Sequence, residues 1–217
     1  MSCCQCQAIE EFHSQKVANQ ELSRYLKKGP SKPTRTLIEA IQKEDIQGLT
    51  LLDIGGGVGA IQHSLLQAGV NHATDVEASN AFIQVAQAEA QHRNLADRVS
   101  HYYGNFVDLA ENILPADIVT LDKVICCYPD METLVDLSSE RASKIYGLVY
   151  PYDTWYNKIV GVLENLYFKI TRNPFRIFVH THLAVEAILV RNGFKQQFFQ
   201  HDLLWQVVVY TRLTGAN

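Results

Sequence analysis

Apolar residues along this chain follow two alternating patterns. Short apolar runs are followed by longer stretches in which apolar positions recur every three or four residues. The runs are typical of buried strands, and the stretches are typical of amphipathic helices. Repeated alternation of the two predicts a parallel sheet with helices on both faces. The predicted strands cover residues 50–54, 72–76, 99–103, 118–125 and 145–150.

The last part of the chain departs from this alternation. Two strands are predicted over residues 195–200 and 203–212, and the polar residues between them are typical of an antiparallel hairpin. Ser79 is well placed to cap the helix that follows the second strand, because its side chain can accept a bond from a free N–H group. Helices are predicted over residues 10–28, 33–43, 58–68, 80–93, 130–144 and 182–192.

Residues 152–178 interrupt the pattern after the fifth strand. This insertion is rich in large apolar side chains, beginning with Trp155, and basic residues are scattered among them. It would form a lid that shapes a substrate pocket, an amphipathic helix in peripheral contact with an anionic membrane, or a helix packed on the core. The basic residues are Lys158, Lys169, Arg172 and Arg176.

Length and composition favour one globular domain. With 217 residues, 47% of them hydrophobic, the chain can bury one sizeable core. We expect residues 1–30 to form a tail and a cap helix, and residues 31–217 to form a single domain with 152–178 as a lid-like insertion. The net charge of −4 argues against a nucleic-acid partner.

The cellular location is predicted from the ends of the chain and from its cysteines. The start, MSCCQCQAIEEF, lacks the basic and apolar regions of a signal peptide, and no apolar run is long enough to span a membrane. Five cysteines in such a chain favour reduced thiols and a cytoplasmic protein. The oligomeric state is left open by the sequence.

The glycine-rich stretch TLLDIGGGVGAIQ at residues 50–62 predicts a strand, a tight turn and a helix start. Such a turn lets a ligand approach the backbone and the helix N-terminus closely. Its spacing fits a dinucleotide through Gly55, Gly57 and Ala60, and fits S-adenosylmethionine equally well through Gly55, Gly57 and Gly59. Asp53 before the turn favours a ligand that carries an ammonium group over a pyrophosphate.

An acid after the second strand is expected to accept hydrogen bonds from a ribose. Asp75 and Glu77 both compete for this role. The terminal hairpin is a further indication, because nicotinamide-binding domains do not usually have one. These features together favour S-adenosylmethionine as the cofactor.

With these motifs, the chain resembles the class I S-adenosylmethionine-dependent methyltransferases over roughly residues 34–212. Residues 51–59, 76–79 and 104–106 look like the first three motifs of that family. The resemblance implies an α/β, Rossmann-like fold with a seven-stranded sheet in the order 3-2-1-4-5-7-6. It further implies that strand 7 is antiparallel, that helices cover both faces, and that a helical insertion follows strand 5.

The resemblance also implies roles for individual residues. Glu77 becomes the preferred ribose acid, and Asn105 with Phe106 would bind the adenine. The family commonly has an aspartate where this chain has Asn105, and either side chain can accept a bond from the adenine amino group. Asp122 corresponds to the end of strand 4, beside the reactive methyl group. Tyr25 would close over the cofactor from the N-terminal helix.

Local similarity gives a weaker indication of the acceptor. Residues 125–129 and 150–151 resemble the magnesium-protoporphyrin O-methyltransferases, while the chain as a whole is more similar to bacterial methyltransferases of unassigned substrate. This implies O-, N- or C-methylation of a small, hydrophobic or aromatic acceptor. The pocket for it would be lined by Cys126, Cys127, Trp155 and Tyr150.

A general base is needed only if the acceptor carries a proton. His180 and Tyr128 are the predicted catalytic residues, although His180 would serve equally well in capping the following helix. A carboxylate acceptor needs no base.

The cysteines support one alternative function. Cys3, Cys4 and Cys6 do not have the spacing of a structural zinc site, and no metal is expected. If they met Cys126 and Cys127, the thiolates would bind a soft metalloid such as arsenic, for sequestration or for methylation. Cys126 and Cys127 fit equally well as apolar pocket walls.

Overall fold

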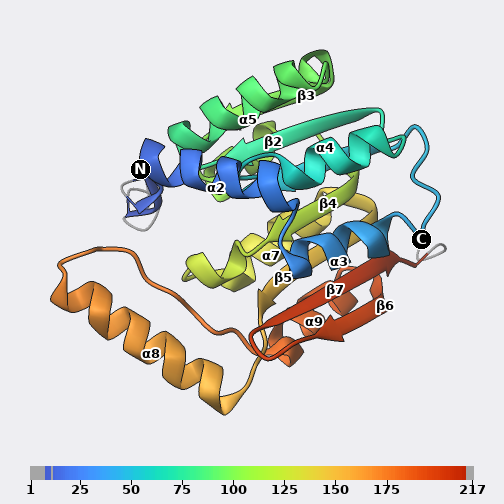
Figure 1. Cartoon of the computed structure of the whole chain (residues 1–217). Coiled ribbons are helices and arrows are strands. Elements are labelled where there is room, and N and C mark those ends of the chain that lie inside the picture. The colour runs from blue at the N-terminus through green and yellow to red at the C-terminus, as the bar shows by residue number, and fades with distance from the viewer. Residues whose placement is uncertain (1–7, 11, 214–217) are drawn as a thin grey trace.

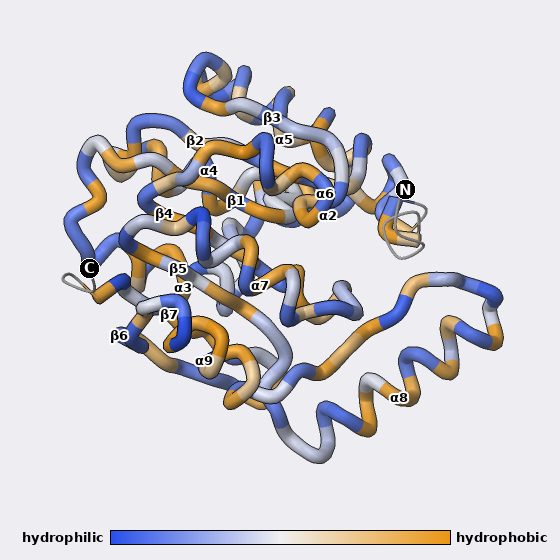
Figure 2. Tube along the Cα trace, turned by 180° about the vertical axis from the view of Figure 1, so that it is seen from behind, coloured by the Kyte–Doolittle hydropathy of each residue, from blue (hydrophilic) through white to orange (hydrophobic). Residues whose placement is uncertain are grey.

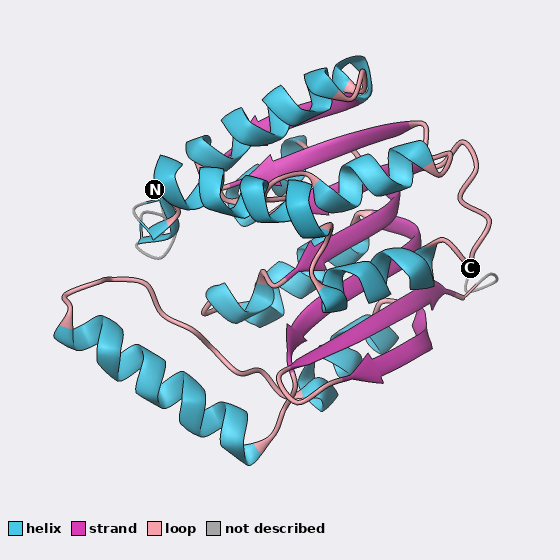
Figure 3. Ribbon diagram, in the orientation of Figure 1, coloured by secondary structure: helices cyan, strands magenta, loops and turns pink. Residues whose placement is uncertain are grey.

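The computed structural model describes residues 8–10 and 12–213 and contains one seven-stranded sheet (Figures 1 and 3). Its strands are β1 (Thr50–Ile54), β2 (His72–Glu77), β3 (Val99–Tyr103), β4 (Ala116–Asp122), β5 (Ala142–Pro151), β6 (Phe194–His201) and β7 (Trp205–Arg212). The helices are α2 (Gln15–Lys28), α3 (Lys32–Ile41), α4 (Ala60–Gln67), α5 (Asn80–His92), α6 (Phe106–Leu109), α7 (Met131–Glu140), α8 (Trp155–Ile170) and α9 (His182–Arg191), with 3-10 turns η1 (Ala96–Arg98), η2 (Ala110–Asn112) and η3 (Ile125–Cys127).

The strand order is β3-β2-β1-β4-β5-β7-β6, as predicted. Strands β1 to β5 pair in parallel, whereas β7 is antiparallel to both β5 and β6. From β1 the chain proceeds outward to β2 and β3, and then returns to place β4 on the other side of β1. Such a reversal leaves a crevice at the carboxyl ends of the two central strands, which is where α/β proteins bind ligands.

Helices cover both faces of the sheet. On one face α3 and α4 contribute Leu37, Ile41 and Leu65 to a buried cluster with strand residues such as Ile118. On the other face α6, α7 and α9 pack on the neighbouring strand positions, which include Val119. Because successive strand residues point to opposite faces, a strand such as β4 must be apolar on both sides. Figure 2 shows this apolar interior along the central strands.

Several predicted boundaries were wrong, and three of them have a clear local reason. Strand β4 ends at Asp122 and not at residue 125, because Lys123 adopts a positive φ of 62° that breaks the extended backbone. The helix capped by Asp130 ends at Glu140, since Ala142 already pairs with β4 as the start of β5. The predicted helix over residues 10–28 is broken before Gln15, because Ser14 has an extended backbone that separates α2 from the helical residues 8–10 and 12.

The insertion at residues 152–178 consists of α8 and an extended return segment (Figure 1). Helix α8 stands off from the sheet and from the helices that cover it (Figure 3). The short connection 152–154 leads into it from β5, and the long segment 171–181 leads from its end to α9. Within residues 8–10 and 12–213, none of the helices combines the length and apolar character that crossing a bilayer requires.

Candidate active site

A cavity of about 590 Å³ opens at the carboxyl ends of β1, β2 and β4. Its walls come from the turns after these strands and after β3, from α2, and from the connection between α2 and α3. It occupies the crevice that the reversal of strand order creates, and its volume is in the range of small-molecule sites. The predicted residues that line it are Tyr25, Asp53, Gly55, Gly57, Glu77, Asn105, Phe106, Asp122, Cys127 and Tyr128.

The glycine turn after β1 forms the floor of the cavity. Gly55 and Gly57 have φ values of 69° and 57°, which side chains rarely adopt. Gly56 has no room for a side chain, because a Cβ atom there would clash with Gln62 Nε2 and Asp75 Oδ1. Gly59 begins α4 in the left-handed conformation but does not line the cavity. The turn therefore presents bare backbone to a ligand, as the sequence predicts.

A buried row of polar side chains crosses the sheet beneath this turn. Thr120, Asp53, Asp75 and His101 occupy paired positions on β4, β1, β2 and β3. Thr120 Oγ1 donates to Asp53 Oδ1 at 2.7 Å, and His101 Nδ1 lies 2.8 Å from Asp75 Oδ2. Burial, with the nearby Asp75 as a second cause, raises the pKa of Asp53 to about 8. Near neutral pH the Asp53 carboxyl is therefore largely protonated, and a cation in the cavity would favour its ionisation.

The structure distinguishes the two acids that compete for the ribose. Asp75 is fully buried, and its pKa is raised mainly by burial. Glu77 lines the cavity, and its oxygens accept hydrogen bonds from Gly57 N at 3.1 Å and Ser79 N at 2.9 Å. Burial raises the pKa of Glu77 to about 7. Only Glu77 is in a position to reach a ligand, which supports the prediction made from the family motif.

Asn105 and Tyr128 meet across the cavity wall. Asn105 accepts a hydrogen bond from Val107 N at the start of α6, which fixes its amide group, and its Nδ2 donates to the Tyr128 hydroxyl at 3.2 Å. Phe106 is buried beside them. A residue predicted for adenine binding and one predicted for catalysis therefore contact each other directly.

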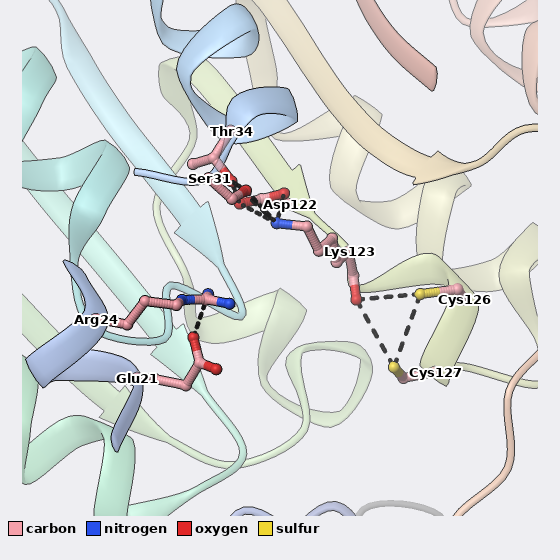
Figure 4. Close-up of polar contacts among 8 residues, drawn as sticks. All are labelled: Glu21, Arg24, Ser31, Thr34, Asp122, Lys123, Cys126 and Cys127. Carbon is pink, nitrogen blue, oxygen red and sulfur yellow. Dashed lines mark hydrogen bonds and ion pairs between the residues drawn. The ribbon is translucent and has the colours of Figure 1, made fainter. Parts of the chain in front are cut away.

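Lys123 is a residue of this site that the sequence reasoning missed. Figure 4 shows its ammonium group beside Ser31, Thr34 and Asp122, with Nζ–oxygen distances of 3.1 Å to Ser31 Oγ and 3.0 Å to Thr34 Oγ1. Thr34 Oγ1 also donates to Asp122 Oδ2 at 2.6 Å. These contacts tie the end of β4 to the connection between α2 and α3. The ammonium also lies 5.6 Å from the ring centroid of Trp205.

Both cysteine thiols of η3 contact the backbone carbonyl of Lys123. Cys126 Sγ and Cys127 Sγ lie 3.2 Å and 3.7 Å from the Lys123 carbonyl oxygen (Figure 4). Cys127 lines the cavity, whereas Cys126 is buried behind it, which corrects the pocket assignment of Cys126. Cysteine acts here as a small side chain that satisfies a carbonyl. The only feature of the sequence that could have indicated Lys123 as a site residue is its position directly after the acid at the end of β4.

His180 does not line the cavity, contrary to its predicted role as a base. Its Nε2 lies 2.9 Å from the Ile125 carbonyl oxygen and 3.2 Å from that of Tyr128, so this nitrogen is the donor. Burial lowers the pKa of His180. The histidine holds the turn that carries Tyr128.

Two further pocket assignments were wrong. Tyr150 is fully buried on the α9 side of the sheet, where a hydrogen bond of 2.9 Å joins its hydroxyl to His182 Nδ1. Trp155 is 74% exposed at the start of α8. None of the described residues from 152 to 178 lines the cavity, so the insertion does not form its wall. Phe12 does line the cavity, and Phe168 and Phe175 pack against it from behind.

The metalloid alternative finds no support. Cys3, Cys4 and Cys6 lie outside the described residues. Within the described part, Cys126 and Cys127 are free thiols with their sulfurs 3.8 Å apart, and no group of three potential metal ligands is found there.

Comparisons with known proteins agree with this geometry. The sequence profile of the family described as "Methyltransferase domain" matches residues 52–140. The chain is similar to magnesium protoporphyrin IX methyltransferase (ChlM) from Synechocystis with bound SAH, with a TM-score of 0.72 and 17% identity over 94% of this chain and 98% of that chain. It is also similar to the putative methyltransferase in complex with the Haloferax volcanii Trm112 activator (TM-score 0.72, 13% identity, 96% of this chain and 98% of that chain). An O-methyltransferase family protein from Burkholderia thailandensis gives a TM-score of 0.71 and 12% identity over 94% of this chain and 61% of that chain. No curated protein matches the sequence.

The sheet order, the glycine turn and the cavity above it define the class I methyltransferase fold. The methyltransferase domain matched over residues 52–140, together with this fold, supports a class I S-adenosylmethionine-dependent methyltransferase. It is therefore an enzyme, and its cofactor is S-adenosylmethionine.

Proposed function

We propose that this enzyme methylates a small, hydrophobic or aromatic acceptor. The observation that carries the proposal is the extent of the cavity. Its lining runs from Glu77 on β2 to Trp205 on β7, with β1, β4 and β5 between these strands in the sheet. The β2 side offers carboxylates and bare backbone, and the remaining wall offers the aromatic side chains of Tyr128 and Trp205.

The residues of the β2 side fit the cofactor. S-adenosylmethionine, when bound, supplies a methyl group activated by the sulfonium. Glu77 would accept the ribose hydroxyls, and Asn105 with Phe106 would hold the adenine. Asp53 and Asp122 would face the ammonium group, with the glycine turn beneath the methionine part. The positive φ values of Gly55 and Gly57, which favour residues without a side chain, support this close approach.

The acceptor would occupy the side with Tyr128 and Trp205. The main task of the chain is to hold the nucleophile in line and about 3 Å from the methyl group, which contributes on the order of 7–11 kcal/mol. For an acceptor with an O–H or N–H group, the Tyr128 hydroxyl is the base that we propose. For a carboxylate acceptor no base is needed, and the Lys123 ammonium would pair with the carboxylate.

The similarity to magnesium protoporphyrin IX methyltransferase makes a planar, hydrophobic carboxylic acid one acceptor to test.

We further propose that the protein acts in the cytoplasm without a nucleic-acid partner. In support, the chain carries a net charge of −4, and Arg24 and Lys123 are the only Lys or Arg side chains among the described residues of the cavity lining. Arg24 forms an ion pair with Glu21.

The test is transfer of a labelled methyl group to a fractionated small-molecule extract, followed by mass spectrometry. We expect label in an organic-soluble product, and we expect Glu77→Ala to remove it. Label found only in protein or nucleic acid would overturn the proposal.

A further inference from the structure

Helix α8 turns its apolar side away from the protein. The exposed apolar side chains on it are Trp155, Ile159, Val160, Val162, Leu163, Leu166, Tyr167 and Ile170, of which Ile170 is 72% exposed. At 3.6 residues per turn, these positions cover an arc of roughly 160°. An amphipathic surface helix ordinarily turns such an arc toward the core. Figure 2 shows the apolar positions along α8 on a helix that stands apart from the sheet.

The polar side of α8 fixes this orientation. Asn157 is buried, and its Nδ2 donates to the carbonyl oxygens of Tyr152, Leu203 and Leu204. Asn165 donates to Ile177 O at 2.7 Å and accepts from Ile177 N at 2.9 Å. The helix cannot roll its apolar arc inward without breaking these bonds, which would leave buried polar groups without partners.

The apolar surface continues beyond the helix. Leu203 and Leu204, in the turn between β6 and β7, are both exposed, and their carbonyls receive the Asn157 bonds at the start of α8. An exposed apolar surface of this extent marks a site of interaction.

Basic side chains border the arc on one side. Lys158 and Lys169 lie on the same flank of α8, and Arg172 follows at its end, all exposed. Lys169 and Arg172 have no acidic partner within the described part of the chain, whereas Lys158 pairs with Asp153 at 2.7 Å. The acid of the helix, Glu164, lies on the opposite flank. This local positive charge stands out in a chain with a net charge of −4.

A second copy of the chain fits this surface less well than a lipid does. Two helices that pair along a seam cover a stripe of about 100°, so part of the arc would remain in water. The 16 residues of α8 are about 24 Å long, and one such helix contact is small beside the roughly 1,200–2,000 Å² of a stable interface. A lipid surface covers the whole arc at once, and the aromatic rings of Trp155 and Tyr167 suit its interface.

We propose that α8 lies on an anionic lipid surface, with its apolar arc at the boundary between headgroups and acyl chains and with Lys158, Lys169 and Arg172 against lipid phosphates. Binding of α8 to lipid does not depend on which acceptor the enzyme methylates. It places the enzyme where a hydrophobic acceptor of the proposed kind is dissolved.

Vesicle sedimentation tests the proposal with the whole protein. The protein should bind vesicles of phosphatidylcholine with phosphatidylglycerol at least about tenfold more tightly than vesicles of phosphatidylcholine alone. Leu163→Glu with Leu166→Glu should abolish binding, and Lys169→Glu with Arg172→Glu should remove the preference for phosphatidylglycerol. Leu114→Glu is the matched control, because Leu114 is exposed before β4, at the opposite end of the sheet, and binding should persist. If wild type and the Leu163/Leu166 variant bind equally, or neither binds, the proposal is overturned.

Two further readouts keep folding, activity and self-association separate. In a Trp205→Phe background Trp155 is the remaining tryptophan, and brominated lipid should quench its fluorescence. Cofactor binding by the Leu163/Leu166 variant should equal that of wild type, so failure of docking and failure of the methyltransferase proposal are distinguishable. A lipid-free dimer that dissociates in this variant, with no vesicle binding by wild type, would assign the arc to a second copy instead.

Discussion

Asn105 and Tyr128 are joined by a hydrogen bond of 3.2 Å, in which the Asn105 amide donates to the tyrosine hydroxyl. The two residues follow β3 and β4, which β2 and β1 separate in the sheet. A donor aimed at the hydroxyl oxygen stabilises the ionised form of the tyrosine more than the neutral form. The same bond places the proposed base beside the residue proposed to hold the adenine.

Tyr128→Phe tests whether the hydroxyl acts as a base. We expect kcat to fall by about 10²–10⁴-fold, the usual contribution of a positioned base, while the dissociation constant for S-adenosylmethionine changes less than about threefold. Steady-state kinetics and calorimetry measure the two quantities. Asn105→Ala should move the ascending limb of the pH–rate profile, on which the base loses its proton, to higher pH. An unchanged kcat in Tyr128→Phe would assign the reaction to an acceptor that needs no base.

The buried acids predict how stability depends on pH. Asp53 and Glu77 have pKa values of about 8 and about 7 in the folded protein, above those of exposed acids, because burial disfavours their charge. Such groups bind protons more tightly in the folded state, so their stabilisation is complete below the unfolded pKa and is lost as pH rises through the folded pKa. We expect the free energy of unfolding of the ligand-free protein to fall between roughly pH 4 and pH 8.

Urea denaturation at a series of pH values measures this dependence. Asp53→Asn should flatten the upper part of the curve, since an amide does not titrate. Its oxygen can still accept from Thr120, and Gln62 keeps a bond by turning its own amide so that its oxygen accepts from the new NH2 group. A free energy of unfolding that rises across this range would contradict the assigned pKa shifts.

Gly56→Ala should damage both the fold and the cofactor site. The added methyl group meets Gln62 and Asp75 beneath the turn, and we expect a loss of about 1–3 kcal/mol in the free energy of unfolding together with weaker cofactor binding. Gly161→Ala is the control. Gly161 lies within α8, and a Cβ atom added there would meet Val179 at an ordinary contact distance of 3.5 Å. It should leave binding intact and stabilise the helix by up to about 1 kcal/mol. Equal effects of the two changes, measured by urea denaturation and calorimetry, would contradict the crowding at Gly56.

Lys123 and Ser31 should be energetically coupled. Their contact joins β4 to the connection between α2 and α3, so we expect Lys123→Met and Ser31→Ala to be non-additive by about 0.5–3 kcal/mol in a double-mutant cycle of unfolding. Ser143→Ala is the distant comparison, because Ser143 donates to Asp117 at the start of β4, at the opposite end of that strand from Lys123. Its effect should be additive with that of Lys123→Met. Additivity of the first pair would show that the contact contributes nothing to stability.

Most of the fold could be predicted because its determinants are local in sequence. The bounds of β1 and β3 were predicted correctly, since both strands are short apolar or alternating runs next to clear turn residues. The end of β4 was not, because a lysine with positive φ has no signature in sequence and depends on tertiary contacts such as those to Ser31 and Thr34.

Most residues named for the cofactor line the cavity, whereas only some of those named for the acceptor do. Motif positions locate Asp53 and Glu77, because the ends of adjacent parallel strands must meet. The directions of His180, Tyr150 and Trp155 depend on how helices pack over the sheet, which residue spacing does not specify. The stand-off position of α8 is of the same kind, since its apolar pattern fits a buried face and an exposed one equally well.

Isothermal titration calorimetry with S-adenosylmethionine and its demethylated product measures directly whether the protein binds the cofactor. We expect one molecule of either ligand to bind per chain, binding to be lost in Glu77→Ala, and binding to be retained in Gly161→Ala. Absence of binding to the folded wild-type protein, or equal binding by wild type and Glu77→Ala, would contradict the account.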